Sequence, residues 1–394
     1  MPKTPYAACR RFFLRAALLG GVAALSACST TGLGPSDQQP SAPPSAAPAP
    51  DAATFGNGPT KVAMILPLTQ GSGQSAVGVS MRNAAELAIQ DSGGNDITVI
   101  VKDDHSTPDG ARDAAQGAIG EGAALILGPL FAADVRAAAA VARPTGKPII
   151  AFSTDLSIAS RGVYLLSFLV EGYVDRIVDY AAGQGKKSIA VLAPENDYAN
   201  VATAALQQTA SRRGLRVELI ERYKPGAVKA SVARVAALGP QIDSLFIPEQ
   251  AAAMPEVAQA LAAAGVDSRK VQILGTGLWN DPRVLSLPAL QGAWFATPDN
   301  AGFNAFAQRY RAKFGADPAR VATLAYDSVS LAAALARTQG PRAYSDEVLT
   351  NPTGFNGADG VFRFRADGGN ERALAVVQIS HGATSVISPA PRSL

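Results

Sequence analysis

The chain has 394 residues, of which 47% are hydrophobic and 17% charged, and its formal net charge is +3. This composition is too apolar for a disordered chain, and the length suffices for two lobes of ordinary domain size. Residues 1–27 carry four basic side chains and no acid, so the remainder has a net charge of −1, which argues against nucleic acid as a partner. Two cysteines (Cys9, Cys28) and two histidines (His105, His381) exclude a disulfide scaffold and a zinc site made of Cys and His alone.

The N-terminus has the pattern of an export signal. An apolar run over residues 16–25 follows the basic residues, and it has the length of a signal-peptide core rather than of a membrane-spanning helix, which needs about 20 residues. Small residues then lead to Cys28, so we expect residues 1–27 to be a signal peptide. The run Cys9-Arg-Arg-Phe-Phe-Leu-Arg15 resembles a twin-arginine signal but also fits a generic basic region, and both export routes stay open.

The segment Leu25-Ser-Ala-Cys28 resembles the bacterial lipobox. The resemblance implies that Cys28 carries acyl chains as the first residue of the mature protein, which would anchor it to a membrane. Ser29 follows, instead of the Asp that retains well-studied lipoproteins at the inner membrane, and this favours the outer membrane of a Gram-negative envelope. Residues 28–59 are rich in Pro, Ala and Ser with no apolar period, so we expect the lipidated cysteine to be followed by a tether.

From residue 60 onwards, short apolar runs alternate with alanine-rich segments of helical length. The runs predicted as strands are Val62–Leu66, Ile97–Val101, Ala124–Leu127, Pro148–Phe152, Ser188–Leu192, Arg216–Ile220, Ser244–Ile247, Val271–Leu274 and Gly292–Ala296. The segments predicted as helices are Val77–Gln90, Asp109–Gly120, Ala132–Ala142, Tyr173–Ala182, Val201–Arg213 and Glu256–Ala264. This alternation predicts an α/β fold with parallel sheets covered by helices, and nine strands are placed more easily in two lobes than in one sheet.

After the ninth strand the pattern changes. A stripe of aromatic residues predicts a buried face on a helix over residues 300–314, and a second helix is expected over 321–337. Two further apolar runs, Val361–Phe364 and Ala373–Ile379, flank a turn-rich segment at 366–370. We expect these two runs to be the strands of a hairpin.

The order of these elements resembles the type I periplasmic binding fold of the leucine/isoleucine/valine-binding-protein superfamily, over about residues 60–385. The segments that carry the resemblance are Val62–Thr69, Lys102–Asp104, Leu127–Leu130, Lys147–Ile150, Pro194–Tyr198, Phe306–Phe314 and Tyr326–Asp327. The resemblance implies two lobes, each a mainly parallel sheet flanked by helices, with a cleft between them. In such open sheets, ligands bind at the carboxyl ends of the strands, where loops and helix N-termini converge.

The resemblance also implies three crossovers between the lobes. They are expected near Leu166–Gly172, Trp294–Pro298 and Gly340–Thr353. The N-terminal lobe would then comprise residues 60–170 plus 299–345, the C-terminal lobe 171–298 plus 346–388, and a short tail 389–394.

Three positions depart from the amino-acid-binding members of that superfamily. Ala132 stands where those members have a hydroxyl residue that grips the ligand carboxylate, and Asp155 stands where they have a threonine that binds the same group. The stretch Gly275–Trp279 lacks the acid that holds the ligand ammonium in them. Losing both partners of a zwitterion argues against the capture of free amino acids.

These departures, the lipid anchor and the tether resemble the lipoproteins known as penicillin-binding-protein activators, and Gly275–Asp281 carries most of that likeness. The resemblance implies that the protein regulates a peptidoglycan-synthesising penicillin-binding protein by direct contact in the cell envelope. The alternative is a substrate-binding lipoprotein of an ABC transporter, which pairs with a permease and captures an amino acid, an amide or another small solute. A tether suits either role.

Catalysis is not expected. The segment Gly71–Ala76 imitates a dinucleotide-binding loop but lies too far from the strand before it, and Asp103–His105 indicates a strand end that caps a helix rather than a metal site. No Gly-x-Ser-x-Gly motif occurs, and no cysteine follows Cys28. We therefore expect a non-enzymatic protein without cofactor or metal.

If the cleft binds a small molecule, its contacts should lie in loops that follow strands or near the first crossover. The candidates are Ser72, Phe131, Ser153, Thr154, Asp155, Tyr173, Asp197, Tyr198, Thr276, Trp279 and Asn280. Trp279 is the strongest, because an aromatic side chain in a loop offers a large contact area at a low entropic cost. We expect roughly half of these residues to pack or to cap helices instead.

Overall fold

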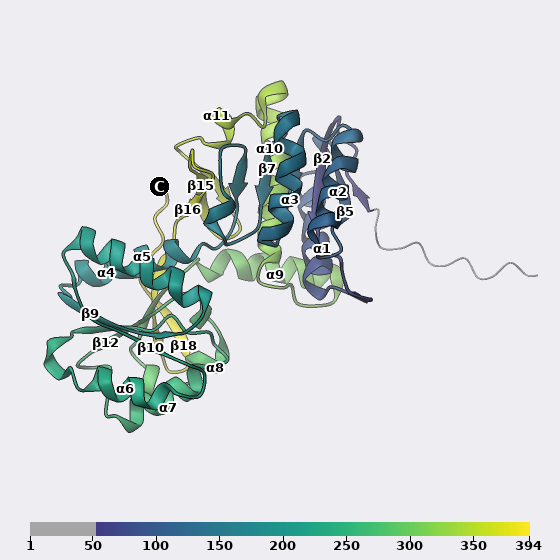
Figure 1. The fold of residues 1–394 in the computed structure, drawn as a ribbon. Coiled ribbons are helices and arrows are strands. Elements are labelled where there is room, and N and C mark those ends of the chain that lie inside the picture. Colours follow the sequence, from purple (N-terminus) through teal and green to yellow (C-terminus); the bar gives the residue numbers. More distant parts are fainter. Residues whose placement is uncertain (1–52) are drawn as a thin grey trace, which may run out of the picture. The chain divides into compact units, whose positions relative to one another are not determined.

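A computed structural model describes residues 53–394 of the protein (Figure 1). The expected signal peptide, Cys28 and most of the expected tether lie outside the described residues. Within residues 53–394, no helix is both long and apolar enough to cross a membrane. The described chain folds as two α/β lobes, each built on its own sheet.

The sheet of the first lobe has the order β1-β5-β2-β6-β7-β8, and all its strands except β1 are parallel. Its strands are β1 (Thr54–Phe55), β2 (Thr60–Leu66), β5 (Ile97–Asp103), β6 (Leu125–Leu127), β7 (Ile149–Ala151) and β8 (Val163–Leu165). The central strands are buried on both faces, which explains why they appear in the sequence as continuous runs of Val, Ile, Leu and Ala. A small hairpin of β3 (Thr69–Gln70) and β4 (Gly73–Gln74) follows β2.

Helices cover both faces of this sheet (Figure 1). The helices α1 (Ala76–Asp91), α9 (Asn300–Phe314) and α10 (Ala322–Gln339) pack on one face, and α2 (Pro108–Gly120) and α3 (Ala132–Ala142) on the other. The aromatic stripe of α9 faces the core as predicted, since Phe306 and Tyr310 are buried there. A short α11 (Asp346–Leu349) and a three-stranded sheet of β14 (Phe355–Gly357), β15 (Gly360–Phe364) and β16 (Asn370–Arg372) complete the lobe.

The sheet of the second lobe has the order β10-β9-β11-β12-β13-β17-β18. Its first five strands are parallel, and β17 pairs antiparallel with both β13 and β18. Its strands are β9 (Ser188–Pro194), β10 (Arg216–Tyr223), β11 (Ser244–Phe246), β12 (Gln272–Gly275), β13 (Trp294–Thr297), β17 (Ala375–Ser380) and β18 (Ala383–Ser388). The helices α4 (Val170–Gly183) and α5 (Asp197–Arg213) cover one face, and α6 (Val228–Ala236), α7 (Met254–Ala263) and the short α8 (Pro282–Leu285) lie on the other.

The two-lobed α/β fold expected from the sequence is confirmed. Each of the nine strands and eight helices predicted for the body overlaps a strand or helix of the structure. The sequence analysis did not predict several short elements, among them β8, α6 and β18.

The predicted third crossover and the predicted hairpin are wrong. Phe355, Phe362 and Phe364 pack in the core of the first lobe, so the chain returns to the second lobe only after Arg372. The strand β15 pairs with β16, whereas β17 pairs with β13 and β18 in the other sheet. The segment from 346 to 372 therefore belongs to the first lobe, and the third crossover lies at residues 373–374. The two runs have similar apolar composition, which does not reveal the sheet that each one joins.

Gly302 allows α9 to approach the turn between β14 and β15. A Cβ atom at this position would lie 1.9 Å from the carbonyl oxygen of Ala358, so Gly302→Ala must displace that turn or the helix. We expect a loss of about 1–3 kcal/mol in the free energy of unfolding, measured by urea denaturation. The matched control is Gly120→Ala at the end of α2, where a Cβ atom meets nothing within 4 Å. Equal stability of the two variants would contradict this packing.

Candidate ligand-binding site

The two sheets share an arrangement that favours a site at one edge. In each lobe the first parallel strand lies between the second and the third, as in β5-β2-β6 and β10-β9-β11. The loops after these strands therefore diverge to opposite faces and leave a crevice at the carboxyl ends of the strands. Most of the candidate residues lie in loops that follow the carboxyl ends of the parallel strands of the two sheets.

In the first lobe, Asp103 fixes the loop that follows β2. One oxygen of its buried carboxylate accepts hydrogen bonds from the backbone N–H groups of Leu68 (2.9 Å) and Thr69 (3.2 Å). The other oxygen accepts the Thr69 hydroxyl at 2.6 Å and lies 3.0 Å from the Nδ1 atom of His105. The Asp103 carboxylate is therefore engaged in hydrogen bonds that stabilise the loop. Residues 53–394 contain no group of three or more His, Cys, Asp or Glu side chains that could hold a metal ion. Ser72 lies exposed at the tip of the loop.

The loops after β6 and β7 run beside each other, because the N–H of Phe152 donates to the carbonyl of Pro129 at 3.0 Å. Phe131 precedes α3 and is 45% exposed, and no side chain caps the helix there. Ser153 is buried and accepts the N–H of Asp155, whereas Thr154 is exposed and its hydroxyl has no hydrogen-bond partner in residues 53–394. The exposed aromatic ring and the free hydroxyl are therefore both available to a ligand.

Asp155 is used within its own lobe. Its carboxylate accepts the N–H of Ser157 at 2.9 Å and pairs with Arg136 at 3.0 Å. Hydrogen bonds from Ser157, together with Arg136, lower the pKa of Asp155. This arrangement is that of a capped and ion-paired surface residue, so Asp155 falls among the candidates with a structural role.

In the second lobe, three candidates come together. The Tyr198 hydroxyl donates to the Thr276 hydroxyl at 2.7 Å, at the carboxyl end of β12. The ring of Tyr173 lies against Gly277, where a Cβ atom would be 2.6 Å from the ring. Burial raises the pKa of Tyr173 to about 12. Of the other candidates in this lobe, Asp197 is exposed in the first turn of α5.

Asn280 connects the second lobe with the start of α9. Its side-chain amide donates to the side-chain oxygen of Asn300, the first residue of that helix, at 2.9 Å. Asn280 therefore lies beside the second crossover, at residues 298–299.

Trp279 does not line the crevice. It is fully buried in the core of the second lobe, beside Phe295, and its ring packs so closely on Gly275 that a Cβ atom there would be 2.3 Å away. The sequence analysis predicted a ligand contact because an aromatic side chain in a loop offers a large contact area, and glycines at 275 and 277 flank the loop. Those glycines instead let the indole lie directly on the backbone.

Exposed apolar side chains gather at the same edges. Five large hydrophobic residues in the described chain are exposed, and four of them follow the carboxyl ends of parallel strands. In the first lobe these are Val77 (37% exposed) and Phe131, and in the second lobe Val201 (39%) and Leu278 (36%). Sequence analysis identified only Phe131, because the others look like ordinary helix or loop residues until the strand ends are known.

The three crossovers lie close together. Thr297, the last residue of β13, pairs with Ala375, the first residue of β17, which brings the second crossover beside the third. The carbonyl oxygen of Ser167 in the first crossover accepts the side-chain amide of Asn370 at 2.9 Å and the Nε atom of Arg372 at 3.0 Å. Hydrogen bonds thus join all three passes of the chain.

Comparison with known proteins agrees with this architecture. A family model described as periplasmic binding protein matches residues 59–384. The chain belongs to the periplasmic binding protein family. Proteins of this family bind ligands in the periplasm. No curated protein sequence matches the chain.

Solved structures of periplasmic binding proteins share the fold. A putative branched-chain amino acid ABC transporter protein from Rhodospirillum rubrum has a TM-score of 0.73 at 20% identity, over 83% of this chain and 99% of that one. A branched-chain amino acid ABC transporter periplasmic ligand-binding protein from Burkholderia xenovorans has 0.68 at 17%, over 84% and 96%. A solute-binding protein from Rhodopseudomonas palustris, in complex with 3,4-dihydroxybenzoic acid, has 0.60 at 23%, over 84% and 96%. At these identities the likeness establishes the fold alone.

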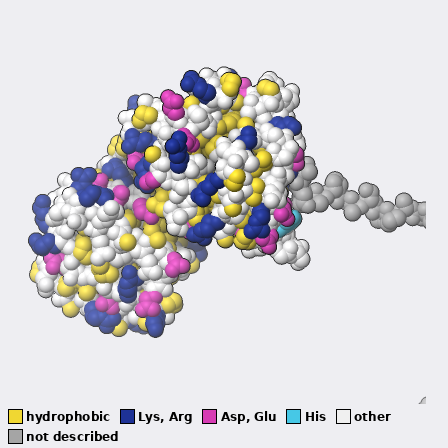
Figure 2. Space-filling view, turned by 45° about the horizontal axis from the view of Figure 1, so that its top comes forward, with side chains coloured by type: hydrophobic (Ala, Val, Ile, Leu, Met, Phe, Trp, Pro, Cys, Tyr) yellow, Lys and Arg dark blue, Asp and Glu magenta, His cyan; other side chains and the backbone are white. Residues whose placement is uncertain are grey.

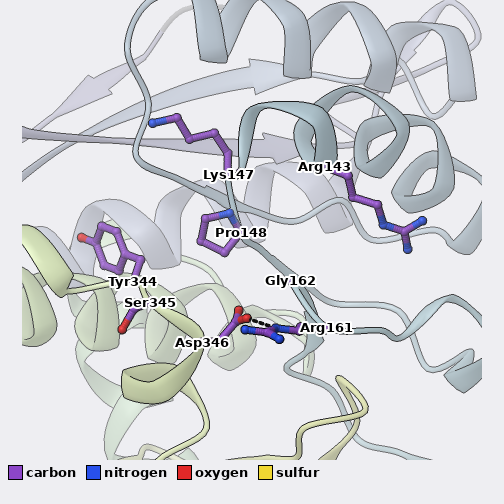
Figure 3. Close-up of a pocket in the computed structure, with 9 residues that line it drawn as sticks. Arg143, Lys147, Pro148, Arg161, Gly162, Tyr344, Ser345 and Asp346 are labelled. Carbon is purple, nitrogen blue, oxygen red and sulfur yellow. Dashed lines mark hydrogen bonds and ion pairs between the residues drawn. The ribbon is translucent and has the colours of Figure 1, made fainter.

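A polar cavity of the first lobe lies at the edge opposite to the one where this fold places ligands. It has a volume of about 360 Å³ and is lined by residues that precede β7 and β8, among them Lys147 and Arg161. Arg161 forms an ion pair with Asp346, and Lys147 and Arg143 point in different directions (Figure 3). These cations do not converge on one point. Over the surface shown in Figure 2, basic and acidic side chains are interspersed.

We expect Trp279→Ala to lower the free energy of unfolding by about 3–5 kcal/mol, because it leaves a large cavity in the core of the second lobe. Denaturant unfolding followed by circular dichroism measures the loss. The neighbouring Leu278→Ala is the control, and because Leu278 is exposed we expect a change within about 0.5 kcal/mol. A small effect of Trp279→Ala on stability would restore Trp279 as a candidate ligand contact.

Asp104 makes the stability of the first lobe depend on pH. It is fully buried, and one of its oxygens accepts the N–H of Ser106 at 2.8 Å while the other has no partner in the described chain. Burial raises the pKa of Asp104 from 3.8 to about 7, with a further contribution from the buried carboxyl of Asp134. Since the folded state favours the protonated acid, the free energy of unfolding should decrease as the pH rises from about 4 to about 7 and then level off.

We expect Asp104→Asn to remove most of this decrease, which amounts to a few kcal/mol because each pKa unit corresponds to about 1.4 kcal/mol. Urea denaturation at several pH values between 4 and 8 gives the slope. Asp109→Asn, at an exposed position, should leave the slope unchanged. The same slope in Asp104→Asn and in the unmodified protein would refute the assignment.

Proposed function

We propose that the protein captures a small solute at the carboxyl edges of its two sheets, as the substrate-binding component of an ABC transporter. The observation that supports this most is that each lobe exposes two large apolar side chains after the carboxyl ends of its parallel strands. Val77 and Phe131 in the first lobe, and Val201 and Leu278 in the second, are exposed at the edges where this fold binds ligands. A solute held against both edges would cover them and remove apolar surface from water.

The polar groups at these edges favour a solute other than a free amino acid. Ala132 has no hydroxyl to grip a carboxylate, and Asp155 is held by Arg136 and Ser157. Glu249, which follows β11 in the second lobe, is buried and accepts the Tyr223 hydroxyl and the N–H of Gln250. Its carboxylate is thus engaged, whereas the carboxylate of Asp197 in the first turn of α5 is exposed and accessible to a cation.

We infer that the solute has an apolar or aromatic body and a small number of polar groups. The exposed Thr154 hydroxyl is available to such groups in the first lobe. In the second lobe Thr276 is buried and its hydroxyl accepts that of Tyr198, so this pair is a structural contact of the edge. Similar folds that hold 3,4-dihydroxybenzoic acid and benzoate make aromatic acids the first compounds to test. We also propose that Cys28 carries a lipid anchor. The outer-membrane location that Ser29 favours suits the regulatory alternative better than a substrate-binding protein that must reach a permease.

Regulation of a penicillin-binding protein remains a weaker proposal. It rested mainly on the resemblance of Gly275–Asp281 to the activator lipoproteins. Within that segment Trp279 fills the core, while Asp281 caps α8 and pairs with Arg283. Because internal packing accounts for these residues, they give no separate support for a partner protein.

Isothermal titration calorimetry against benzoate, hydroxybenzoates, branched-chain amino acids and amides tests the proposal. We expect micromolar binding of an aromatic or apolar solute, and about tenfold weaker binding in Phe131→Ala and in Leu278→Ala, since each removes about 1–2 kcal/mol of apolar contact. Val386→Ala is the control, because Val386 is 55% exposed on β18, away from both edges.

Two outcomes would contradict the proposal. The first is equal affinity of Phe131→Ala, Leu278→Ala and Val386→Ala for a bound solute, which would place the site elsewhere. The second is the absence of solute binding together with capture of a peptidoglycan synthase in a pull-down, which would restore the regulatory function.

A further inference from the structure

The chain continues beyond its last strand, β18, as a tail that comprises residues 389–394. No helix or strand includes the tail, and residues 391–393 are exposed. Pro389 and Pro391 restrict its backbone to extended conformations, so the tail spans roughly 19 Å at about 3.1 Å per residue. A stiff segment of this length can connect points on different lobes.

The tail starts on the second lobe, where Arg176 of α4 holds it. The Nη2 atom of Arg176 donates to the hydroxyl of Ser388, the last residue of β18, at 2.6 Å. The Nε atom of the same guanidinium group donates to the carbonyl of Leu374 at 2.8 Å. Arg176 thus fixes the start of the tail to α4 and to the third crossover.

The tail ends against the first lobe. Leu394 is half-buried and lines a cavity of about 210 Å³. The first lobe contributes to this cavity Leu156, which lies between β7 and β8, as well as Arg365 and Glu371. The second lobe contributes residues of α4, among them Asp175. Figure 1 shows the C-terminal end beside β15 and β16, which belong to the first lobe.

The walls of this cavity belong to two lobes that the chain itself joins only at the three crossovers. A rotation of one lobe against the other moves Leu156 relative to α4 and changes the shape of the cavity. The apolar contact of Leu394 with both walls exists in one relative position of the lobes and is lost in others. It therefore stabilises the position in which it forms.

We propose that the tail is a strap that holds the two lobes in the arrangement of this structure. Its start stays in place when the lobes rotate, because Ser388 and Arg176 belong to the same lobe. Its end must leave the cavity, so the release of Leu394 accompanies the rotation. The tail thus biases the equilibrium between different arrangements of the lobes. The proposal goes beyond solute capture and does not depend on which solute the protein binds.

Cross-linking tests whether the tail reaches the first lobe in solution. Cys9 and Cys28 are replaced by serine, and the changes Leu156→Cys and Leu394→Cys introduce a new pair of thiols. We expect a short bismaleimide to join the two positions within one molecule, as detected by mass spectrometry of the digested protein. The matched control combines Leu156→Cys with Val386→Cys, because Val386 is exposed on β18 and does not line the cavity. No cross-link at residue 394, or equal cross-linking of both pairs, would overturn the proposal.

Distances between spin labels test whether the tail biases the arrangement of the lobes. In the same serine background, labels are attached through Gln116→Cys on α2 and Gln207→Cys on α5, at exposed positions of the two lobes. Deletion of residues 389–394 should increase the population of other distances about fivefold, because a half-buried leucine contributes about this factor to an equilibrium constant. An unchanged distribution would show that the crossovers alone set the arrangement, and it would refute the strap.

A point variant separates the effect of Leu394 from any disturbance of β18 by the deletion. Leu394→Ala keeps the length of the tail and removes its apolar contact, so we expect a smaller change in the same direction. Val386→Ala is the matched control and should leave the distances as they are in the unmodified protein, because Val386 lies outside the cavity. The same distribution in Leu394→Ala and Val386→Ala would contradict the role of Leu394.

Discussion

The junction of the two lobes depends on the hydrogen bonds that the Ser167 carbonyl accepts from Asn370 and Arg372. The chain passes between the lobes three times, and backbone groups that each pass buries must find hydrogen-bond partners. The Ser167 bonds fix the first pass to the third, and the pairing of Thr297 with Ala375 fixes the third to the second. The positions of both sheets, and hence of the loops at their carboxyl ends, depend on this small set of contacts.

The loops at those ends are built by different means in the two lobes. In the first lobe the buried Asp103 carboxylate organises the loop after β2 through backbone and hydroxyl donors. In the second lobe, close contacts at two glycines, Gly275 and Gly277, allow Trp279 and Tyr173 to pack against the backbone. Both solutions leave a few apolar side chains exposed above a rigid base. Such a surface can hold an apolar molecule with little rearrangement, which favours binding.

The fold was largely predictable from the sequence, because strands buried on both faces leave continuous runs of Val, Ile, Leu and Ala. The third crossover was not, since β15 and β17 have the same kind of apolar pattern and only the tertiary structure assigns them to different sheets. For the candidate site, spacing after strands placed Phe131, Thr154, Tyr198 and Thr276 at the carboxyl ends of the strands, where the structure also has them. It failed for Trp279, whose burial depends on contacts with Gly275 and Phe295. The contact of Arg372 with the Ser167 carbonyl could not be predicted, because it joins distant segments that show no common motif.

The placement of the two tryptophans has a consequence for spectroscopy. Trp279 and Trp294 are the only tryptophans of the chain, and both belong to the second lobe, one in its core and the other beside Tyr180 on β13. Intrinsic tryptophan emission therefore reports on the second lobe, while the first lobe contributes only tyrosine signals. If the lobes melt separately, fluorescence and far-ultraviolet dichroism will record different midpoints, and their difference will reveal the order in which the lobes unfold.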